Sequence, residues 1–206
     1  MPNIVYTIGH STHSLDQLTS LLAHHAITAI GDVRSRPYSR TNPQFNREPF
    51  KSALKELGIA YVFLGSELGA RSDDPACYGD VKVSYEKLAR SALFRSGLQR
   101  VRTGAQSYRL ALMCAEKEPL DCHRTILVAR HLEECGLQVQ HILADGSLEK
   151  HSATLERLIR RLGIGEDLFK TAAAAVREAY EIQEARIAYK RPGNEPFHPV
   201  PAGATR

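Results

Sequence analysis

Short apolar runs alternate along the chain with segments whose apolar residues recur at helical spacing. This alternation is typical of a mostly parallel sheet whose strands are connected by helices. The apolar runs predict strands at residues 4–8, 28–33, 60–63, 108–114 and 139–143. We therefore predict an α/β fold with an open, mostly parallel sheet of about five strands, flanked by helices and followed by a C-terminal helical appendage.

Helical spacing fills the intervals between these runs. Ser14 and Gln17 fit a capping box at the start of a first helix, and leucines on one face follow them. Gly58 and Gly136 lie where two later helices should end. Those later helices are predicted at residues 49–57, 84–102, 123–135, 151–162 and 166–189.

The length of 206 residues and the hydrophobic content of 43% suffice for one sizeable core. We expect residues 3–145 to form the α/β domain that carries the site. Residues 146–189 should add C-terminal helices that pack on this domain or extend from it. The tail at residues 190–206 contains four prolines, so we expect it to lack regular structure.

Charge changes this picture locally. The formal net charge is only +4, but the segment 34–51 carries five basic side chains against the single acidic Glu48. A patch of this kind favours an anionic partner. The N-terminus lacks the pattern of a signal peptide, and no apolar run approaches membrane-spanning length. We expect a cytoplasmic protein without membrane contact, whose four cysteines stay reduced.

Residues that could carry chemistry follow three of the predicted strands. In open parallel sheets the ligand crevice lies beyond the carboxyl ends of the strands, so one rim could hold all of these residues. They are His10, Ser11, Asp32, Arg34, Arg36, Tyr38, Cys114, Cys122, His123 and Arg124.

The segment from Cys114 to Arg124 is the most informative of these. Cys114 ends an apolar strand, and Cys122 and His123 open a predicted helix after a seven-residue loop. A helix N-terminus binds anions and lowers the pKa of a nearby thiol. Cys122 is therefore the candidate nucleophile or redox thiol. Cys114 is expected as its resolving partner or as a packing residue.

The other candidate residues are predicted to transfer protons, to orient groups or to bind substrate near the Cys122 thiol. His123 or His10 would carry a proton, and Asp32 would orient an arginine or the substrate, although a structural ion pair explains Asp32 equally. The predicted substrate-binding residues are Ser11, Arg34, Arg36, Tyr38 and Arg124. This set predicts an enzyme that acts on a phosphate-bearing or other anionic substrate, without a cofactor.

Two alternatives stay open. The basic loop 34–51 contains Tyr38 and Phe45 among its arginines, and this mixture also suits a nucleic-acid-binding module without catalysis. Alternatively, Cys114, Cys122 and His123, with His10 brought in by the fold, could ligate a zinc-type metal. The seven-residue gap does not match the short spacing of common zinc motifs. None of these patterns indicates an oligomeric state.

Several of these segments together resemble the domain of unknown function 488 family. The match extends over roughly residues 3–143 and leaves out the terminal helices and the tail. It implies a small α/β domain of bacterial or archaeal type in which the rim residues act as a unit, and it implies no particular reaction. The matching segments are residues 6–11, 32–37, 42–45, 64–65, 68–69, 113–116 and 122–124.

Overall fold

The computed structural model describes residues 4–165 and 171–191. Its centre is a six-stranded sheet in the order β3-β2-β4-β1-β5-β6, in which only β6 is antiparallel to its neighbour. The predicted open, mostly parallel α/β sheet is confirmed. The strands are β1 (Ile4–Gly9), β2 (Ala29–Asp32), β3 (Ala60–Phe63), β4 (Leu110–Cys114), β5 (Gln138–Ile142) and β6 (Leu148–Lys150).

The sixth strand, β6, was not predicted. It has three residues, two of them exposed, and it therefore carries no apolar run that could reveal a strand. The predicted strands at 28–33 and 108–114 are each longer than the observed β2 and β4. Thr28, Tyr108 and Arg109 belong to the connections that lead into the sheet, and Val33 follows the end of β2.

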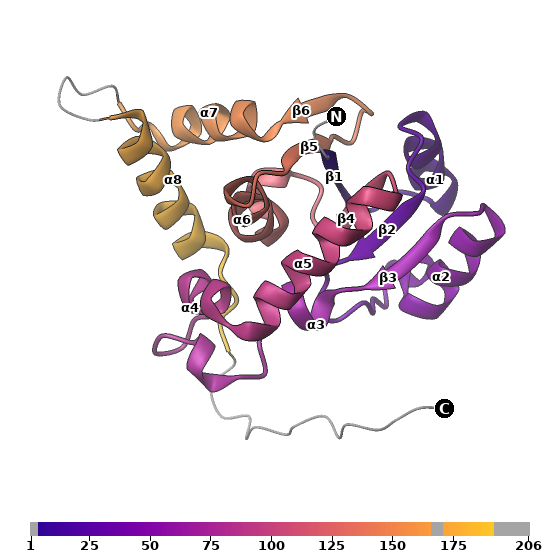
Figure 1. The fold of residues 1–206 in the computed structure, drawn as a ribbon, viewed down its shortest axis with the longest axis horizontal. Helices are drawn as coiled ribbons and strands as arrows, with labels where there is room; N and C mark the ends of the chain where they lie inside the picture. The colour runs from indigo at the N-terminus through magenta and orange to yellow at the C-terminus, as the bar shows by residue number, and fades with distance from the viewer. Residues whose placement is uncertain (1–3, 166–170, 192–206) are drawn as a thin grey trace.

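Helices cover both faces of the sheet (Figure 1). α1 and α2 lie on one side, α5 and α6 lie on the other, and α8 runs from α7 toward α4. The helices are α1 (Leu15–His24), α2 (Arg47–Glu56), α3 (Gly65–Leu68), α4 (Tyr85–Arg90), α5 (Ala92–Ser107), α6 (Arg130–Glu134), α7 (His151–Leu162) and α8 (Ala172–Ile187).

Two buried clusters lie on opposite faces of the sheet, because successive side chains of a strand point to opposite sides. Met113 of β4 packs in the cluster that contains Leu18 of α1 and Phe50 of α2. Its neighbour Leu112 packs in the cluster that contains Phe94 of α5. All five of these side chains are fully buried. The central strands are therefore covered on both faces, which fixes their register and the position of their carboxyl ends.

Two predicted helices differ from the observed ones. The helix predicted at 84–102 is interrupted at Ser91, which has an extended backbone and accepts a hydrogen bond from the Phe94 amide as the N-cap of α5. The helix predicted at 123–135 begins with the π-helical segment η4 (Arg124–Ala129) and continues as α6. π-Helical turns occur frequently at functional sites.

The C-terminal helices pack on the sheet. α7 has the predicted bounds, and it ends at Gly163 in the left-handed conformation. Leu158 of α7 and Ala179 of α8 lie in the same buried cluster as Val139 of β5. The predicted start of the last helix and most of the predicted proline-rich tail lie outside the described residues. Among the residues described, no helix is long and apolar enough to cross a membrane.

Candidate active site

A cavity of about 730 Å³ opens where β1, β2 and β4 end. The segments that follow β1 and β4 leave toward opposite faces of the sheet, since α1 packs in one buried cluster and η4 in the other. Ligand crevices of open α/β sheets form at such switch points. Seven of the residues predicted from the sequence line this cavity: His10, Ser11, Arg34, Arg36, Tyr38, Cys114 and His123.

Three other predicted residues lie behind the cavity wall. Asp32, Cys122 and Arg124 are buried, with exposed fractions of 0%, 1% and 0%. The shared rim expected from the strand ends therefore has two layers. One layer faces the cavity, and the second supports it from within the protein.

Asp32 holds Arg34 in a fixed orientation. Its two carboxylate oxygens accept hydrogen bonds from Arg34 Nε at 2.9 Å and Nη2 at 2.6 Å, and Tyr61 donates its hydroxyl to Asp32 Oδ2 at 2.8 Å. Arg34 Nη2 also donates to the Phe45 carbonyl at 2.8 Å. This geometry matches the arginine-orienting role expected for Asp32. Sequence reasoning missed Tyr61, because nothing in the sequence of the edge strand β3 indicates that this hydroxyl reaches the neighbouring strand.

His10 is held as a neutral ring beside Arg34. Its Nδ1 lies 2.9 Å from the Ser11 carbonyl oxygen, which can only accept, so Nδ1 carries the hydrogen and Nε2 accepts from Arg34 Nη1 at 3.2 Å. Burial and the charge of Arg34 lower the pKa of His10 to about 4. Ser11 itself has a φ of 48°, a conformation that is uncommon outside glycine and that recurs at functional sites.

Arg124 shapes the loop that carries part of the site. Its Nη1 donates to the Glu116 carbonyl at 2.6 Å and its Nη2 to the Lys117 carbonyl at 3.2 Å. Gly9 permits this packing, because a Cβ atom there would lie 1.9 Å from the Glu116 carbonyl oxygen. Arg124 was predicted to contact substrate, but in the structure its guanidinium is engaged with the main chain.

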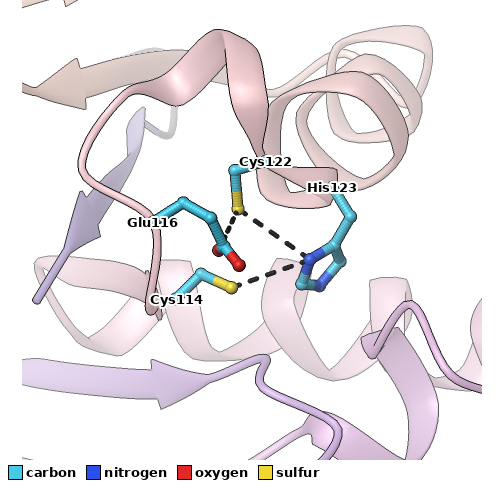
Figure 2. Close-up of side chains that lie close together, drawn as sticks. All are labelled: Cys114, Glu116, Cys122 and His123. Carbon is cyan, nitrogen blue, oxygen red and sulfur yellow. Dashed lines mark hydrogen bonds between the residues drawn. The ribbon is translucent and has the colours of Figure 1, made fainter. Parts of the chain in front are cut away.

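Four side chains gather at the cavity floor (Figure 2). Cys114 ends β4 and Glu116 follows it, while Cys122 and His123 lie directly before η4. One donor atom from each of the four lies within 4.8 Å of the others. We call them the Cys–Glu–His cluster. Sequence reasoning missed Glu116, although a carboxylate two residues after Cys114 in the same polar loop was a usable signal.

Short contacts connect the cluster. His123 Nδ1 lies 3.6 Å from Cys114 Sγ and 3.9 Å from Cys122 Sγ, and Cys122 Sγ donates to Glu116 Oε2 at 3.0 Å (Figure 2). Cys114, Glu116 and His123 line the cavity, whereas Cys122 lies beneath them. All four cysteines of the chain are free thiols. The cluster could hold a metal ion. Its fourth ligand group would be Glu116 and not His10, which was predicted there from the sequence.

The cluster perturbs its own ionisation. Burial raises the pKa of the Cys122 thiol well above its usual value, and the adjacent Cys114 adds to this effect. Burial alone would raise the pKa of Glu116, but hydrogen bonds from the Cys114 and Cys122 thiols lower it to about 2. For His123 burial acts to lower the pKa, but the contacts with Cys122 and Glu116 outweigh burial and raise the pKa above its usual value. The free Cys122 thiol is thus protonated at neutral pH, and its predicted catalytic role stays a prediction.

Residues from distant segments complete the wall. Arg71 lies in the loop after α3, and its guanidinium stacks at 4.6 Å over the ring of Tyr189, which follows α8. Both residues line the cavity, together with Lys117 and Tyr85. No local pattern in the sequence links residue 71 with residue 189. An antiparallel bridge between Lys82 and Lys190 and a hydrogen bond from the Val83 amide to the Tyr189 carbonyl hold the segment after α8 beside the segment that leads into α4.

Comparison with known proteins is limited to the family. The family model of the domain of unknown function DUF488 matches residues 14–131, which is more than half of the chain. The matched region begins at the capping residue of α1 and includes the Asp32–Arg34 pair and the whole Cys–Glu–His cluster. No curated protein and no solved structure matches the chain. The resemblance predicted from the motifs is confirmed, and the chain belongs to the DUF488 family.

Proposed function

We propose that the protein is an enzyme that acts on a phosphate-bearing or other small anionic substrate, such as a nucleotide, bound in the cavity. One observation carries the proposal. Four cationic side chains and two acidic ones line the cavity, and its floor is the Cys–Glu–His cluster. The four cations are Arg34, Arg36, Arg71 and Lys117.

The cations differ in how firmly they are held. Arg34 is fixed by Asp32 and Arg71 by the ring of Tyr189. A guanidinium that is already oriented loses little conformational entropy when an anion binds. We assign Arg34 and Arg71 to a preoriented part of the anion site and Arg36 and Lys117 to further direct contacts with the anion, with Tyr38 and Ser11 at the cavity mouth. The Cys–Glu–His cluster would then perform the chemistry as a unit, as a hydrolase or transferase centre.

A binding experiment with matched variants tests this function. Inorganic phosphate, pyrophosphate and a nucleoside monophosphate would be titrated into the protein by calorimetry. Arg36→Ala should weaken binding of the best ligand by about 10- to 100-fold, which is the usual loss for a charge-assisted hydrogen bond. Arg102→Ala, which removes an exposed guanidinium from the far part of α5, should leave the affinity unchanged. Equal affinity in both variants would reject the cavity as the anion site.

The nucleic-acid alternative has weaker support. Tyr38 is 69% exposed and could stack on a base. However, the basic residues of the segment 34–51 do not form one track: Arg34 and Arg36 line the cavity, whereas Arg47 and Lys51 line a separate hollow. A single-stranded oligonucleotide should therefore bind weakly, and the logarithm of its binding constant should fall only slightly with the logarithm of the salt concentration. A steep slope would favour the binding module over the enzyme. The free thiols suit the cytoplasmic location that we expect.

A further inference from the structure

We propose that Cys114, Glu116, Cys122 and His123 bind one zinc-type divalent ion at the floor of the cavity. This inference deepens the proposed function by naming a resident metal for the same site. It rests on that function only in giving the metal a catalytic task, because the ligand geometry can be tested without any substrate.

The distances from His123 Nδ1 to the two sulfurs are close to those of a tetrahedral site. Zinc–sulfur and zinc–imidazole bonds of about 2.3 Å and 2.05 Å at tetrahedral angles separate sulfur and nitrogen by about 3.6 Å. The observed separations of His123 Nδ1 from the two sulfurs are 3.6 Å and 3.9 Å. Glu116 Oε2 lies 3.0 Å from Cys122 Sγ and would have to move outward by roughly 0.6 Å. Glu116 is the exposed member of the cluster, so its side chain can make that adjustment.

The orientation of His123 is an independent indication. Its Nε2 lies 3.1 Å from the Val33 carbonyl oxygen. A carbonyl only accepts, so Nε2 carries the hydrogen. Nδ1 faces both sulfurs, where its lone pair would be available to a metal once that nitrogen is deprotonated. Histidines that ligate metals commonly donate their second N–H to a main-chain carbonyl or a carboxylate in this way.

The chain also braces the other ligands. The Arg124 amide points to Cys122 Sγ at 3.4 Å, and the Arg124 side chain ties the main chain of Glu116 to the start of η4. The loop after Cys114 is thereby held against Cys122 and His123 before any ion binds. A preorganised ligand set of this kind reduces the cost of metal binding.

The donor types select the metal. Two thiolates and an imidazole favour zinc over magnesium or calcium, which prefer oxygen ligands. Cys122 and His123 are buried, and Glu116 faces the cavity, so Glu116 is the ligand that water or a substrate oxygen could displace. A metal at this position would supply a Lewis acid, or an activated water, directly beneath the bound anion.

Cobalt(II) is the probe that tests the site, because a tetrahedral cobalt–thiolate centre absorbs strongly in the visible and near-ultraviolet. The full-length protein, reduced and stripped with a chelator, should bind one equivalent of cobalt with thiolate charge-transfer bands, and zinc should displace it. Cys114→Ser and Cys122→Ser should each lose most of that absorption. Their zinc affinity should fall by roughly 100-fold or more, above the loss that outer contacts of a ligand usually cause.

Controls keep the test decisive. Cys77→Ser and Cys135→Ser remove the two cysteines outside the cluster and should leave the spectrum unchanged. Circular dichroism checks the fold of each variant, and Glu116→Gln, at an exposed position, supplies a weaker-binding variant if a cysteine variant does not fold. A cobalt spectrum without thiolate bands, or equal zinc affinity in Glu116→Gln and wild type, would overturn the proposal. Rapid formation of a Cys114–Cys122 disulfide with no metal uptake would also overturn it.

The outcome separates the two proposals. Metal uptake without phosphate binding would support the metal site and reject the anionic substrate. Phosphate binding by a protein that takes up no metal would leave the proposed function standing and reject the metal.

Discussion

Two groups of polar side chains lie on the same sheet and differ in what surrounds them. The Cys–Glu–His cluster opens to the cavity through Cys114, Glu116 and His123. The second group, which we call the histidine chain, connects β1, β5, α7 and α8 and is enclosed by the protein. It consists of Thr7, His141, His151 and Tyr180, with successive hydrogen bonds of 2.7, 3.0 and 2.8 Å.

On the functions that we propose, this difference separates a structural network from a reactive one. In the histidine chain each neutral ring can donate from one nitrogen and accept at the other, so the hydrogen bonds run in one direction from end to end. The Cys–Glu–His cluster has a different composition: its two thiols, imidazole and carboxylate are metal-ligand types whose donor atoms lie within 4.8 Å of one another. A histidine is therefore expected to serve stability in one region and ligand binding in the other.

Replacing one histidine in each region should give the largest contrast. His141→Ala removes a fully buried ring and leaves Thr7 and His151 without their partner, so we expect a loss of about 3–4 kcal/mol in the free energy of unfolding. His123→Ala should cost less stability but abolish cobalt binding. Urea unfolding and cobalt titration of both variants measure the two effects. Equal stability losses with metal binding retained in His123→Ala would remove the distinction.

Acid should weaken the histidine chain. Burial lowers the pKa of His151 to about 4, and it lowers the pKa of His141 as well. Their neutral forms therefore contribute stability that is fully present above the unfolded-state value near 6.5 and is lost as the pH falls toward 4. The titration of His151 alone should lower the free energy of unfolding by about 3 kcal/mol once the pH is well below 4. Urea midpoints between pH 7.5 and 4 would show this decline.

A variant identifies the source of that decline. His151→Gln should flatten part of the pH dependence, and the remainder should come from groups such as His10, whose pKa is also about 4. An unchanged slope in His151→Gln would show that the chain titrates little in this range.

Gly9→Ala should damage the cavity region without touching the histidine chain directly. The added Cβ would meet the Glu116 carbonyl oxygen at 1.9 Å, so the loop that carries Glu116 must shift. We expect a loss of about 1–3 kcal/mol in stability and a clear weakening of both phosphate and cobalt binding. Gly104→Ala is the control, because its Cβ would meet only Leu110 Cδ2 at an ordinary 3.6 Å. Normal ligand binding by Gly9→Ala would mean that this close approach does not position the site.

The smallest effect should come from the end of the histidine chain. Tyr180→Phe removes the hydroxyl that contacts His151 Nε2 at 2.8 Å and leaves that nitrogen without this partner. The expected loss is about 1–2 kcal/mol in stability, with phosphate and cobalt affinities unchanged. A change in either affinity would indicate that the two regions are coupled.

The sequence was informative where chemistry follows local pattern. Apolar runs placed the strands, and the strand-end rule placed His10, Arg34, Cys114 and His123 at one cavity. The strand-end rule could not distinguish the residues that line the cavity from the buried residues behind them. Arg124 is buried because Gly9 lets the loop approach it and two loop carbonyls accept its hydrogen bonds. The two carbonyls are only seven and eight residues from Arg124, but the approach of Gly9 joins segments more than a hundred residues apart, so no local pattern records it.

The most direct test of the central claim is whether an anion in the cavity reaches the metal. Cobalt-loaded protein would be titrated with inorganic phosphate while its visible spectrum is recorded. If the cavity and the Cys–Glu–His cluster form one site, phosphate should change the cobalt bands saturably, and Arg36→Ala should shift the midpoint to higher phosphate concentration. A cobalt–thiolate spectrum that stays the same at saturating phosphate would contradict the claim.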